Sequence, residues 1–174
     1  MQFTPYLNFD GNCAEAFAFY AKLFGGKIVY QGTFAEMPAS EGMPPIPDAA
    51  KQRIMHMHLQ VKEQALMGSD TMPGADETCG GGYQKPQGLW VSIHAADVAE
   101  GQRLFDALAQ GGQTLLPYAA TFWSKRFGMV PDRFGTPLYV YSLRAMLAAL
   151  AAYQRALAGR RHLICYAMKA NSNL

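Results

Sequence analysis

The feature that most constrains this chain is an internal repeat. A strand, a helix and three further strands follow one another in the first 70 residues, and the same order recurs about 85 residues later. Self-similarity of this kind predicts two copies of one unit. Runs of apolar and alternating residues predict strands over 3–9, 27–34, 53–61 and 65–69, and again over 89–94, 113–121, 122–130 and 136–141.

Each predicted helix has a start signal and a stop signal. Asn12 and Asp97 are N-cap residues, and each is followed three positions later by a glutamate, which is the capping-box pattern. The glycine pairs at 25–26 and 111–112 end the helices, because glycine adopts the left-handed backbone of a C-cap at little cost. The apolar stripes between these signals predict helices that each cover one face of a sheet.

One copy of the repeat is too small to bury its sheet alone. We therefore expect an α+β fold in which tandem β-α-β-β-β units pack against each other, with their sheets enclosing a cleft and their helices outside. This domain is expected to cover residues 1–141, with units at about 1–70 and 88–141. Residues 142–174 would form a separate helix-strand tail.

The distribution of charge supports a boundary near residue 136. The chain has 15 Lys and Arg and 13 Asp and Glu; 10 of the basic and all 13 acidic residues precede Thr136, so that this part carries −3 and the rest +5. Five dispersed cations without a basic run among exposed aromatic residues do not form a nucleic-acid surface. We expect no nucleic-acid partner.

The hydrophobic stretches are too short to cross a membrane. Charges such as Lys22 and Arg103 interrupt them well before the roughly 20 residues that a membrane helix needs. The first residues lack the basic and then apolar pattern of a secretory leader. The three cysteines, Cys13, Cys79 and Cys165, form no CxxC pair, which is typical of free thiols in a reducing compartment. We expect a cytoplasmic protein with no membrane partner, in which Cys13 is buried and inert.

Several motifs lie in order along the repeat and carry a family resemblance. They are PYLNFDGNC at 5–13, MH at 55–56, LMGSD at 66–70, TFW at 121–123 and DRFG at 132–135. Together with the repeat, they closely resemble the PhnB-like proteins of the vicinal-oxygen-chelate (VOC, glyoxalase/bleomycin-resistance) superfamily over about residues 1–141. The resemblance implies a cupped mixed sheet around a small-molecule pocket, usually completed in a homodimer. It implies no defined activity, and names such as demethylubiquinone methyltransferase say little about the chemistry of this branch.

The resemblance also implies where a metal would bind. Members of the superfamily with metal chemistry place His or Gln on the first strand of each unit and Glu on its last strand. In this chain the first-strand positions fall near Pro5 and near Leu89 or Trp90, and the last-strand positions near Asp70 and Tyr139. Only Asp70 offers a hard oxygen, whereas a metal site needs three or four convergent ligands. We expect no metal at these positions.

His56 and His58 are the leading candidates for catalysis or metal binding. They lie two residues apart on a predicted strand and therefore share a face. They can hold a divalent metal together, or one can act as a general base near neutral pH, or one can be a pocket-wall residue and the other a polar edge. The resembling proteins carry a histidine at the position of His56, which favours it as the catalytic candidate. Asp70 can orient His56 or accept a substrate proton, but a carboxylate at this strand end is more often a turn former.

An aromatic pocket wall is the second candidate site. Trp123 with Phe122 and Phe127 would hold a planar or apolar ligand by stacking, although we expect Phe122 and Phe127 to serve first in core packing. Methionines on the predicted strands would make such a pocket compliant. The remaining pocket candidates are Tyr6, His58 and Tyr139.

The tail resembles a different protein. Ser142 can cap a helix with an apolar stripe that ends at Gly159, and residues 162–168 are predicted as a buried strand. The stripe is too apolar to remain in water, so we expect it to dock. The stretch 134–173 is similar to the N-terminal portion of diaminopimelate decarboxylase, whose Tyr-Ala-x-Lys-Ala-Asn motif implies that Lys169 would hold pyridoxal phosphate. Without the rest of that enzyme we expect no bound pyridoxal phosphate.

Three hypotheses for the function remain after these arguments. The leading expectation is a protein that binds a small, partly apolar metabolite in a sheet-enclosed pocket without metal chemistry. The alternative is a metal-dependent enzyme of the glyoxalase or dioxygenase type that uses His56. A remote alternative is a pyridoxal-phosphate decarboxylase fragment that uses Lys169.

Overall fold

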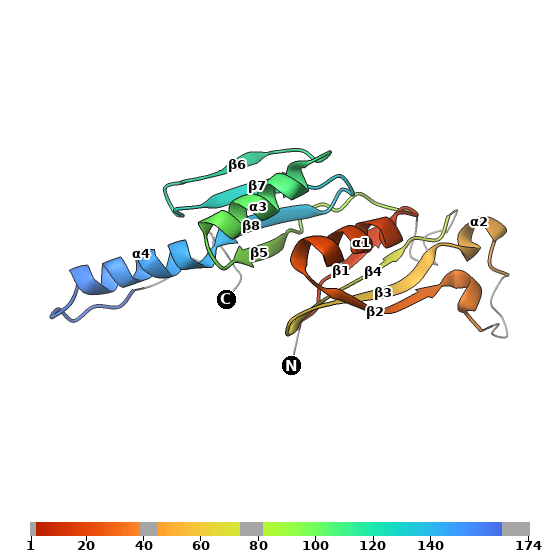
Figure 1. The fold of residues 1–174 in the computed structure, drawn as a ribbon, viewed down its shortest axis with the longest axis horizontal. Helices are drawn as coiled ribbons and strands as arrows, with labels where there is room; N and C mark the ends of the chain where they lie inside the picture. Colours follow the sequence, from red (N-terminus) through yellow and green to blue (C-terminus); the bar gives the residue numbers. More distant parts are fainter. Residues whose placement is uncertain (1–2, 39–44, 74–81, 165–174) are drawn as a thin grey trace. The chain divides into compact units, whose positions relative to one another are not determined.

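A computed structural model of the chain describes residues 3–38, 45–73 and 82–164. The chain divides into two compact units, Met1–Lys85 and Pro86–Leu174. Each unit has a four-stranded mixed sheet and the same order of elements, a strand, a long helix and three strands (Figure 1). The predicted internal repeat and the α+β class are therefore confirmed.

The first unit is built on the strand order β1-β4-β3-β2. β1 pairs with β4 in parallel, while β3 pairs antiparallel with both β4 and β2. Helix α1 covers one face of this sheet (Figure 1). The elements of the unit are β1 (Tyr6–Phe9), α1 (Cys13–Phe24), β2 (Lys27–Thr33), the short 3-10 helix η1 (Phe34–Glu36), α2 (Asp48–Lys51), β3 (Ile54–Val61) and β4 (Gln64–Asp70).

The core of the first unit lies between α1 and the sheet. Phe17 and Tyr20 of α1 are buried, and so are Met57 and Leu59 of β3. The rings of Phe17 and Phe9 meet edge to face with their centroids 6.1 Å apart, which is a favoured aromatic geometry. The apolar stripe of the helix thus fixes which face of β3 points inward.

The start of α1 differs from the predicted capping box. The side chain of Asn12 makes no capping hydrogen bond within the described residues. Instead, Oδ1 of Asp70 accepts the backbone N–H groups of Gly11 at 2.8 Å and Cys13 at 3.0 Å. The physical reason is the parallel pairing of Phe9 with Asp70, which places the end of β4 beside the first residues of the helix.

The second unit repeats this topology with the strand order β5-β8-β7-β6. Here the predicted N-cap forms, because Asp97 Oδ1 accepts the N–H of Glu100 at 2.9 Å. The carboxylate of Glu100 in turn accepts the N–H of Ala96 at 2.7 Å. The elements of the unit are β5 (Val91–Ala95), α3 (Val98–Ala109), β6 (Leu116–Ala119), β7 (Phe127–Pro131), β8 (Pro137–Ser142) and α4 (Leu143–Ala156).

Two glycines allow α3 to lie close to its sheet. A Cβ added at Gly101 of α3 would overlap the hydroxyl and ring of Tyr118 on β6. A Cβ added at Gly128 of β7 would lie 2.6 Å from Cε2 of Phe105 on α3. Both positions therefore exclude a side chain for steric reasons.

The glycine that lies beneath the helix phenylalanine is on a different strand in each unit. In the first unit Met57 of β3 pairs with Gly68 of β4, whereas in the second unit Gly128 of β7 pairs with Val140 of β8. A Cβ added at Gly68 would lie 2.8 Å from Cε2 of Phe17, so this glycine also accommodates a helix phenylalanine. Each unit thus joins one large and one small residue beneath its helix, in opposite order.

The turn before β8 forms as predicted from its DRFG motif. Oδ1 of Asp132 accepts the backbone N–H groups of Phe134 and Thr136, each at 3.0 Å. Gly135 has a φ of 84°, in the left-handed region that glycine adopts without strain.

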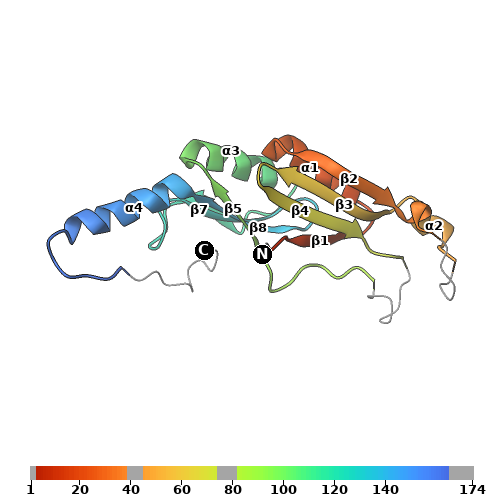
Figure 2. The same ribbon diagram turned by 90° about the horizontal axis from the view of Figure 1, so that it is seen from below.

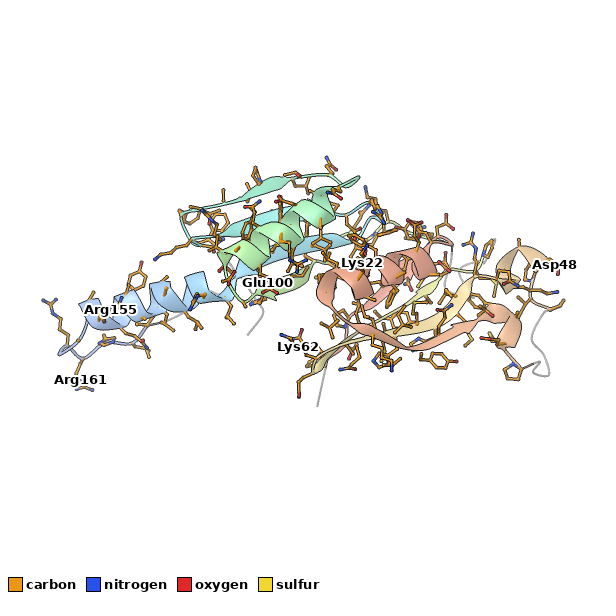
Figure 3. The ribbon with its side chains drawn as sticks, viewed as in Figure 1. Lys22, Asp48, Lys62, Glu100, Arg155 and Arg161 are labelled. Carbon is orange, nitrogen blue, oxygen red and sulfur yellow. The ribbon has the colours of Figure 1, made fainter. Side chains whose placement is uncertain are left out.

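The tail begins with the expected helix, α4, and several residues of its apolar stripe are exposed among the described residues. Leu147 is 55% exposed and Tyr153 is 65% exposed. The helix runs away from the second sheet (Figure 2); Figure 3 labels Arg155 in its last turn and Arg161 in the segment that follows it. The predicted strand at 162–168 is wrong for residues 162–164, which have no strand pairing, and its remainder lies outside the described residues.

Candidate functional site

The first candidate surface is the face of the first sheet opposite α1. Because side chains alternate along a strand, His56 and His58 point away from the helix-facing Met57 and Leu59. The register places Tyr30 of β2 and Met67 of β4 on either side of His58. We call this surface the histidine face; it consists of Tyr6, Tyr30, His56, His58 and Met67.

Two tyrosines hold the ring of His56. β4 lies between β1 and β3, so the side chain of Tyr6 crosses β4 to reach His56. The Tyr6 hydroxyl lies 3.1 Å from Nδ1 of His56, and the two rings stack with centroids 5.7 Å apart. The ring of Tyr30 lies 5.7 Å from the same imidazole. Tyr6 and Tyr30 are about half exposed, so this ring cluster is open to a ligand.

His58 has an unusual polar atom. Its Nε2 is buried and has no hydrogen-bond partner among the described residues. A buried polar atom without a partner is uncommon, because it has lost its hydrogen bonds to water without replacing them. This nitrogen is therefore a candidate contact for a bound group.

Asp70 lies on the other face of the sheet. It follows Gly68 by two residues, and Gly68 lies beneath Phe17 of α1, so both residues point toward the helix side. The carboxylate is buried; its Oδ2 accepts the N–H of Ile54 at 2.8 Å, in addition to the two bonds that Oδ1 makes at the start of α1. The geometry gives Asp70 a structural role on the face of the sheet opposite His56. A catalytic role for Asp70 stays a prediction.

Cys13 is fully buried, as expected. Burial, with a smaller contribution from the charge of Asp70, raises the pKa of its thiol to about 12. A thiol that stays protonated at neutral pH is a poor nucleophile and a poor metal ligand. The geometry therefore gives Cys13 a role in packing.

The second candidate surface is the face of the second sheet opposite α3. Gly128 packs beneath Phe105, so its neighbours Phe127 and Met129 point the other way. The register then adds Tyr141 and Tyr139 of β8, and the parallel partner β5 adds His94 opposite Tyr141. We call this surface the aromatic face; it consists of Trp90, His94, Trp123, Phe127, Tyr139 and Tyr141.

The rings of the aromatic face form one connected group. Trp90 and Tyr139 stack with their centroids 4.5 Å apart and their planes 6° apart. Phe127 lies 5.3 Å from Tyr139, 4.7 Å from Tyr141 and 5.8 Å from Trp123. These separations are typical of favourable aromatic pairs, so the group is held in place by its own contacts.

A turn before β7 presents two further aromatic rings. The N–H of Thr121 donates to the carbonyl of Ser124 at 2.7 Å, and the N–H of Ser124 donates to the Thr121 hydroxyl at 3.0 Å. Phe122, between them, is 96% exposed, so the expectation that it packs in the core is wrong. Trp123 is 43% exposed, whereas Phe127 is buried as expected. Because Thr121 and Ser124, the two ends of this turn, are hydrogen-bonded to each other, the side chain of Phe122 points outward.

His94 is a residue of this face that sequence reasoning missed. Its ring lies 5.4 Å from that of Tyr141, and partial burial lowers its pKa below the usual value. Trp90 and Tyr141 were missed as well. The signal was present in the sequence, since Trp90, Ser92 and His94 alternate along one strand and Tyr139 and Tyr141 along its neighbour.

The predicted site residues fall into two groups. Tyr6, His56 and His58 lie together on the histidine face. Tyr139 and Trp123 lie on the aromatic face, and Phe122 contacts Trp123 with ring centroids 4.4 Å apart. Lys169 lies outside the described residues.

The residues at the metal positions of the superfamily do not fit a metal centre. Pro5 and Trp90 offer no suitable donor, and Asp70 uses both carboxylate oxygens for backbone N–H groups on the helix side. Among residues 3–38, 45–73 and 82–164, no group of three or more His, Cys, Asp or Glu side chains is arranged to hold a metal ion.

Comparison with known proteins decides the family. A family model described as 3-demethylubiquinone-9 3-methyltransferase matches residues 1–140. The chain belongs to this PhnB-like family. It is 35% identical over 145 residues to the protein YjdN of Escherichia coli K12, which covers 79% of this chain and 92% of YjdN.

Solved structures extend the comparison to the fold. The PhnB-like chain is 38% identical to protein PA1353 of Pseudomonas aeruginosa, with a TM-score of 0.70 over 82% of this chain and 97% of that one. The PhnB protein of Bacillus cereus is 23% identical, with a TM-score of 0.60 over 82% of this chain and 99% of that one. The fosfomycin resistance protein FosX of Listeria monocytogenes is 8% identical, with a TM-score of 0.54 over 84% of this chain and 97% of that one. This likeness concerns the VOC fold alone.

About a quarter of the chain matches diaminopimelate decarboxylases. The enzyme of Pseudomonas aeruginosa is 58% identical over 45 residues, which is 26% of this chain and 11% of that enzyme. The match supports the second resemblance seen in the sequence, and it leaves about nine-tenths of the decarboxylase without a counterpart here.

In the part of the chain that the structure describes, no helix is long and apolar enough to span a membrane.

Proposed function

We propose that this PhnB-like protein binds a small, partly apolar metabolite on the aromatic face of its second unit, without metal chemistry. The observation that carries this proposal is the stack of Trp90 on Tyr139, with planes 6° apart, next to the partly exposed Trp123. Parallel indole and phenol rings of this kind bind the flat face of a planar ligand.

Exposure supports a binding role over a purely structural one. Phe122 and Trp123 are held outward by the hydrogen-bonded turn at 121–124, although exposed aromatic side chains of this size are unfavourable in water. His94 offers a polar group beside the ring of Tyr141, which would orient the polar end of the ligand. The ligand class that fits is a planar ring with one polar substituent.

Intrinsic fluorescence gives a direct test, because Trp90 and Trp123 are the two tryptophans of the chain. Naphthalene-2-carboxylate is a suitable planar probe, and cyclohexanecarboxylate is a non-planar control of the same charge. Calorimetric titration with the planar probe should give saturable binding, with tryptophan emission changing in parallel. The non-planar acid should bind more weakly.

Matched variants locate the binding. Tyr139→Ala should weaken binding by about twofold to tenfold, which corresponds to the loss of one stacking partner. Tyr153→Ala, on the exposed face of α4, removes the same side chain and should leave the affinity unchanged. Equal affinities for the two variants, or no saturable binding by the parent, would overturn the proposal.

The alternative function is a metal-dependent enzyme of the glyoxalase or dioxygenase type that uses His56. The fixed ring of His56, 3.1 Å from the Tyr6 hydroxyl, favours it. Metal analysis of protein purified without chelators separates the two functions. A stoichiometric divalent ion in the parent that is lost in His56→Ala would favour the enzyme.

Three further parts of the proposal follow from the family and the sequence. We propose a homodimer in the cytoplasm, since PhnB-like pockets are usually completed in homodimers and the cysteine pattern fits a reducing compartment. We propose that Lys169 forms no pyridoxal-phosphate site, because so little of the decarboxylase is present. Size-exclusion chromatography with light scattering tests the dimer, and absorbance of the purified protein tests the cofactor.

A further inference from the structure

The histidine face has a feature that ligand binding by the second unit does not explain. Nε2 of His58 is buried and has no partner in the described part of the chain, although the neighbouring strands bring it beside Met67 and Tyr30. Proteins seldom retain a buried nitrogen in this state unless a water, an ion or a ligand contacts it. The position of this atom is therefore the starting point for a binding site.

Three side chains with donor atoms occupy neighbouring positions on this face. His56 and His58 lie two residues apart on the same face of β3, at a Cα separation of about 6.5 Å by strand geometry, which allows two imidazoles to reach one ion. Met67 is the direct cross-strand neighbour of His58, and cross-strand neighbours on one face have Cβ atoms about 5 Å apart. The thioether of Met67 and the two rings thus lie within reach of a common point.

The hydrogen bond of Tyr6 selects the nitrogen that His56 offers. Nδ1 of His56 lies 3.1 Å from the Tyr6 hydroxyl, so its Nε2 is the ring nitrogen left for an ion. A hydrogen bond to the second nitrogen is the usual way in which proteins orient a metal-binding histidine. Tyr6 is thus a positioning residue for this site.

We propose that the histidine face binds one cuprous ion through the imidazoles of His56 and His58 and the thioether of Met67. Imidazole suits copper and zinc, and a thioether selects the softer Cu(I). The donor groups carry no negative charge, which disfavours a divalent ion in a partly buried site more than a monovalent one. The site lies on the first unit and does not depend on the ligand-binding role proposed for the second.

Competition with the chromogenic chelator bicinchoninate, under anaerobic reducing conditions, tests the proposal. The thiols of Cys79 and Cys165 would also bind Cu(I), so the measurement uses the full chain with Cys79→Ser and Cys165→Ser; Cys13 stays because it is fully buried. The protein should withdraw one equivalent of Cu(I) from the chelator. Zn(II), titrated in parallel with a zinc indicator, should bind at least tenfold more weakly.

Variants then assign the donors. His58→Leu and Met67→Leu should each weaken Cu(I) binding by at least about tenfold. This is the lower end of the loss of metal affinity that follows when residues around a metal site are replaced. His94→Leu, which removes a histidine from the other unit, should have no effect. Met67→Leu keeps the side-chain volume, so it tests the thioether even if His58→Leu fails to fold. No withdrawal of Cu(I), equal loss in His94→Leu, or Zn(II) bound as tightly as Cu(I) would overturn the proposal.

Discussion

Asp70, the last residue of β4, accepts the backbone N–H of Cys13 at the start of α1 across 57 positions of sequence. The same carboxylate accepts the N–H groups of Gly11 and Ile54. A single buried side chain thus joins the end of one strand, the start of another and the start of the helix that covers both. Hydrogen bonds to a buried carboxylate are stronger than neutral ones, so this junction is a main support of the first unit.

Asp70→Asn should lower the free energy of unfolding by about 2–4 kcal/mol, because the amide group of asparagine would face one of three backbone donors. Urea denaturation measures this change. Asp10→Asn is the matched control, since the ion pair of Asp10 with Arg53 is exposed and should cost about 1 kcal/mol or less. Similar losses in the two variants would contradict the structural role of Asp70.

Gly101→Ala should destabilise the second unit by about 1–3 kcal/mol, although alanine is normally the better helix residue. The new methyl group would overlap the hydroxyl and ring of Tyr118. Thermal unfolding followed by circular dichroism measures the loss. Gly82→Ala, where a Cβ meets nothing within 4 Å, should be nearly neutral, and adding Tyr118→Phe to Gly101→Ala should recover part of the stability. A stabilised Gly101→Ala protein would rule out this packing.

The thiol of Cys13 should resist alkylation in the folded protein. Its pKa is raised to about 12 by burial, so in a Cys79→Ser, Cys165→Ser background the native protein should react with iodoacetamide at pH 8 far more slowly than the denatured protein. A rate similar to that of the unfolded chain would contradict the burial of this residue.

The same raised pKa predicts a pH effect on stability. The thiol keeps its proton in the folded state but ionises with its ordinary pKa of 9.0 in the unfolded state. Its contribution to the free energy of unfolding is therefore fully present below pH 9 and is lost as pH rises toward 12. Cys13→Ala should therefore show a smaller fall in unfolding free energy between pH 8 and pH 10 than the parent. If the unfolding free energy of the variant and the parent fell equally with pH, another group would be the cause of the loss of stability at alkaline pH.

Removal of residues 143–174 should leave a folded, soluble protein with less tendency to associate. The truncation takes away α4, whose Leu147 and Tyr153 are exposed, and leaves β8 complete. Light scattering at increasing concentration should show less aggregation than for the full chain, and size-exclusion chromatography should show the proposed dimer. Aggregation or a monomer in the truncated protein alone would contradict this expectation.

Much of the fold could be predicted because local signals repeat. Glycine pairs, capping residues and apolar stripes specify both helices, and the turn at Asp132 follows from its side chain bonding to its own backbone. Asn12 was the exception. Its helix is capped by Asp70, and a contact over such a distance in sequence leaves no local pattern.

The candidate site was less predictable. The shared face of His56 and His58 follows from alternation alone, but the crossing of β4 by Tyr6 depends on the strand order β1-β4-β3, which sequence does not specify. In the second unit, Trp90 and Tyr141 look like ordinary strand residues until the register stacks them with their neighbours. The sequence shows the residue type of Asp70 but not the face on which it lies, so its hydrogen bonds at the start of α1 could not be predicted.

The opposite order of large and small residues in the two units bears on how a duplicated sequence diverges. Met57 and Gly68 in one half correspond to Gly128 and Val140 in the other, so copying either residue alone into the other half would put two bulky groups, or two glycines, under one helix phenylalanine. The first change would overfill the interface and the second would leave a void. The halves can therefore exchange these positions only as pairs, and a chimera made by crossing over between β3 and β4 should fold less well than one that swaps both strands together.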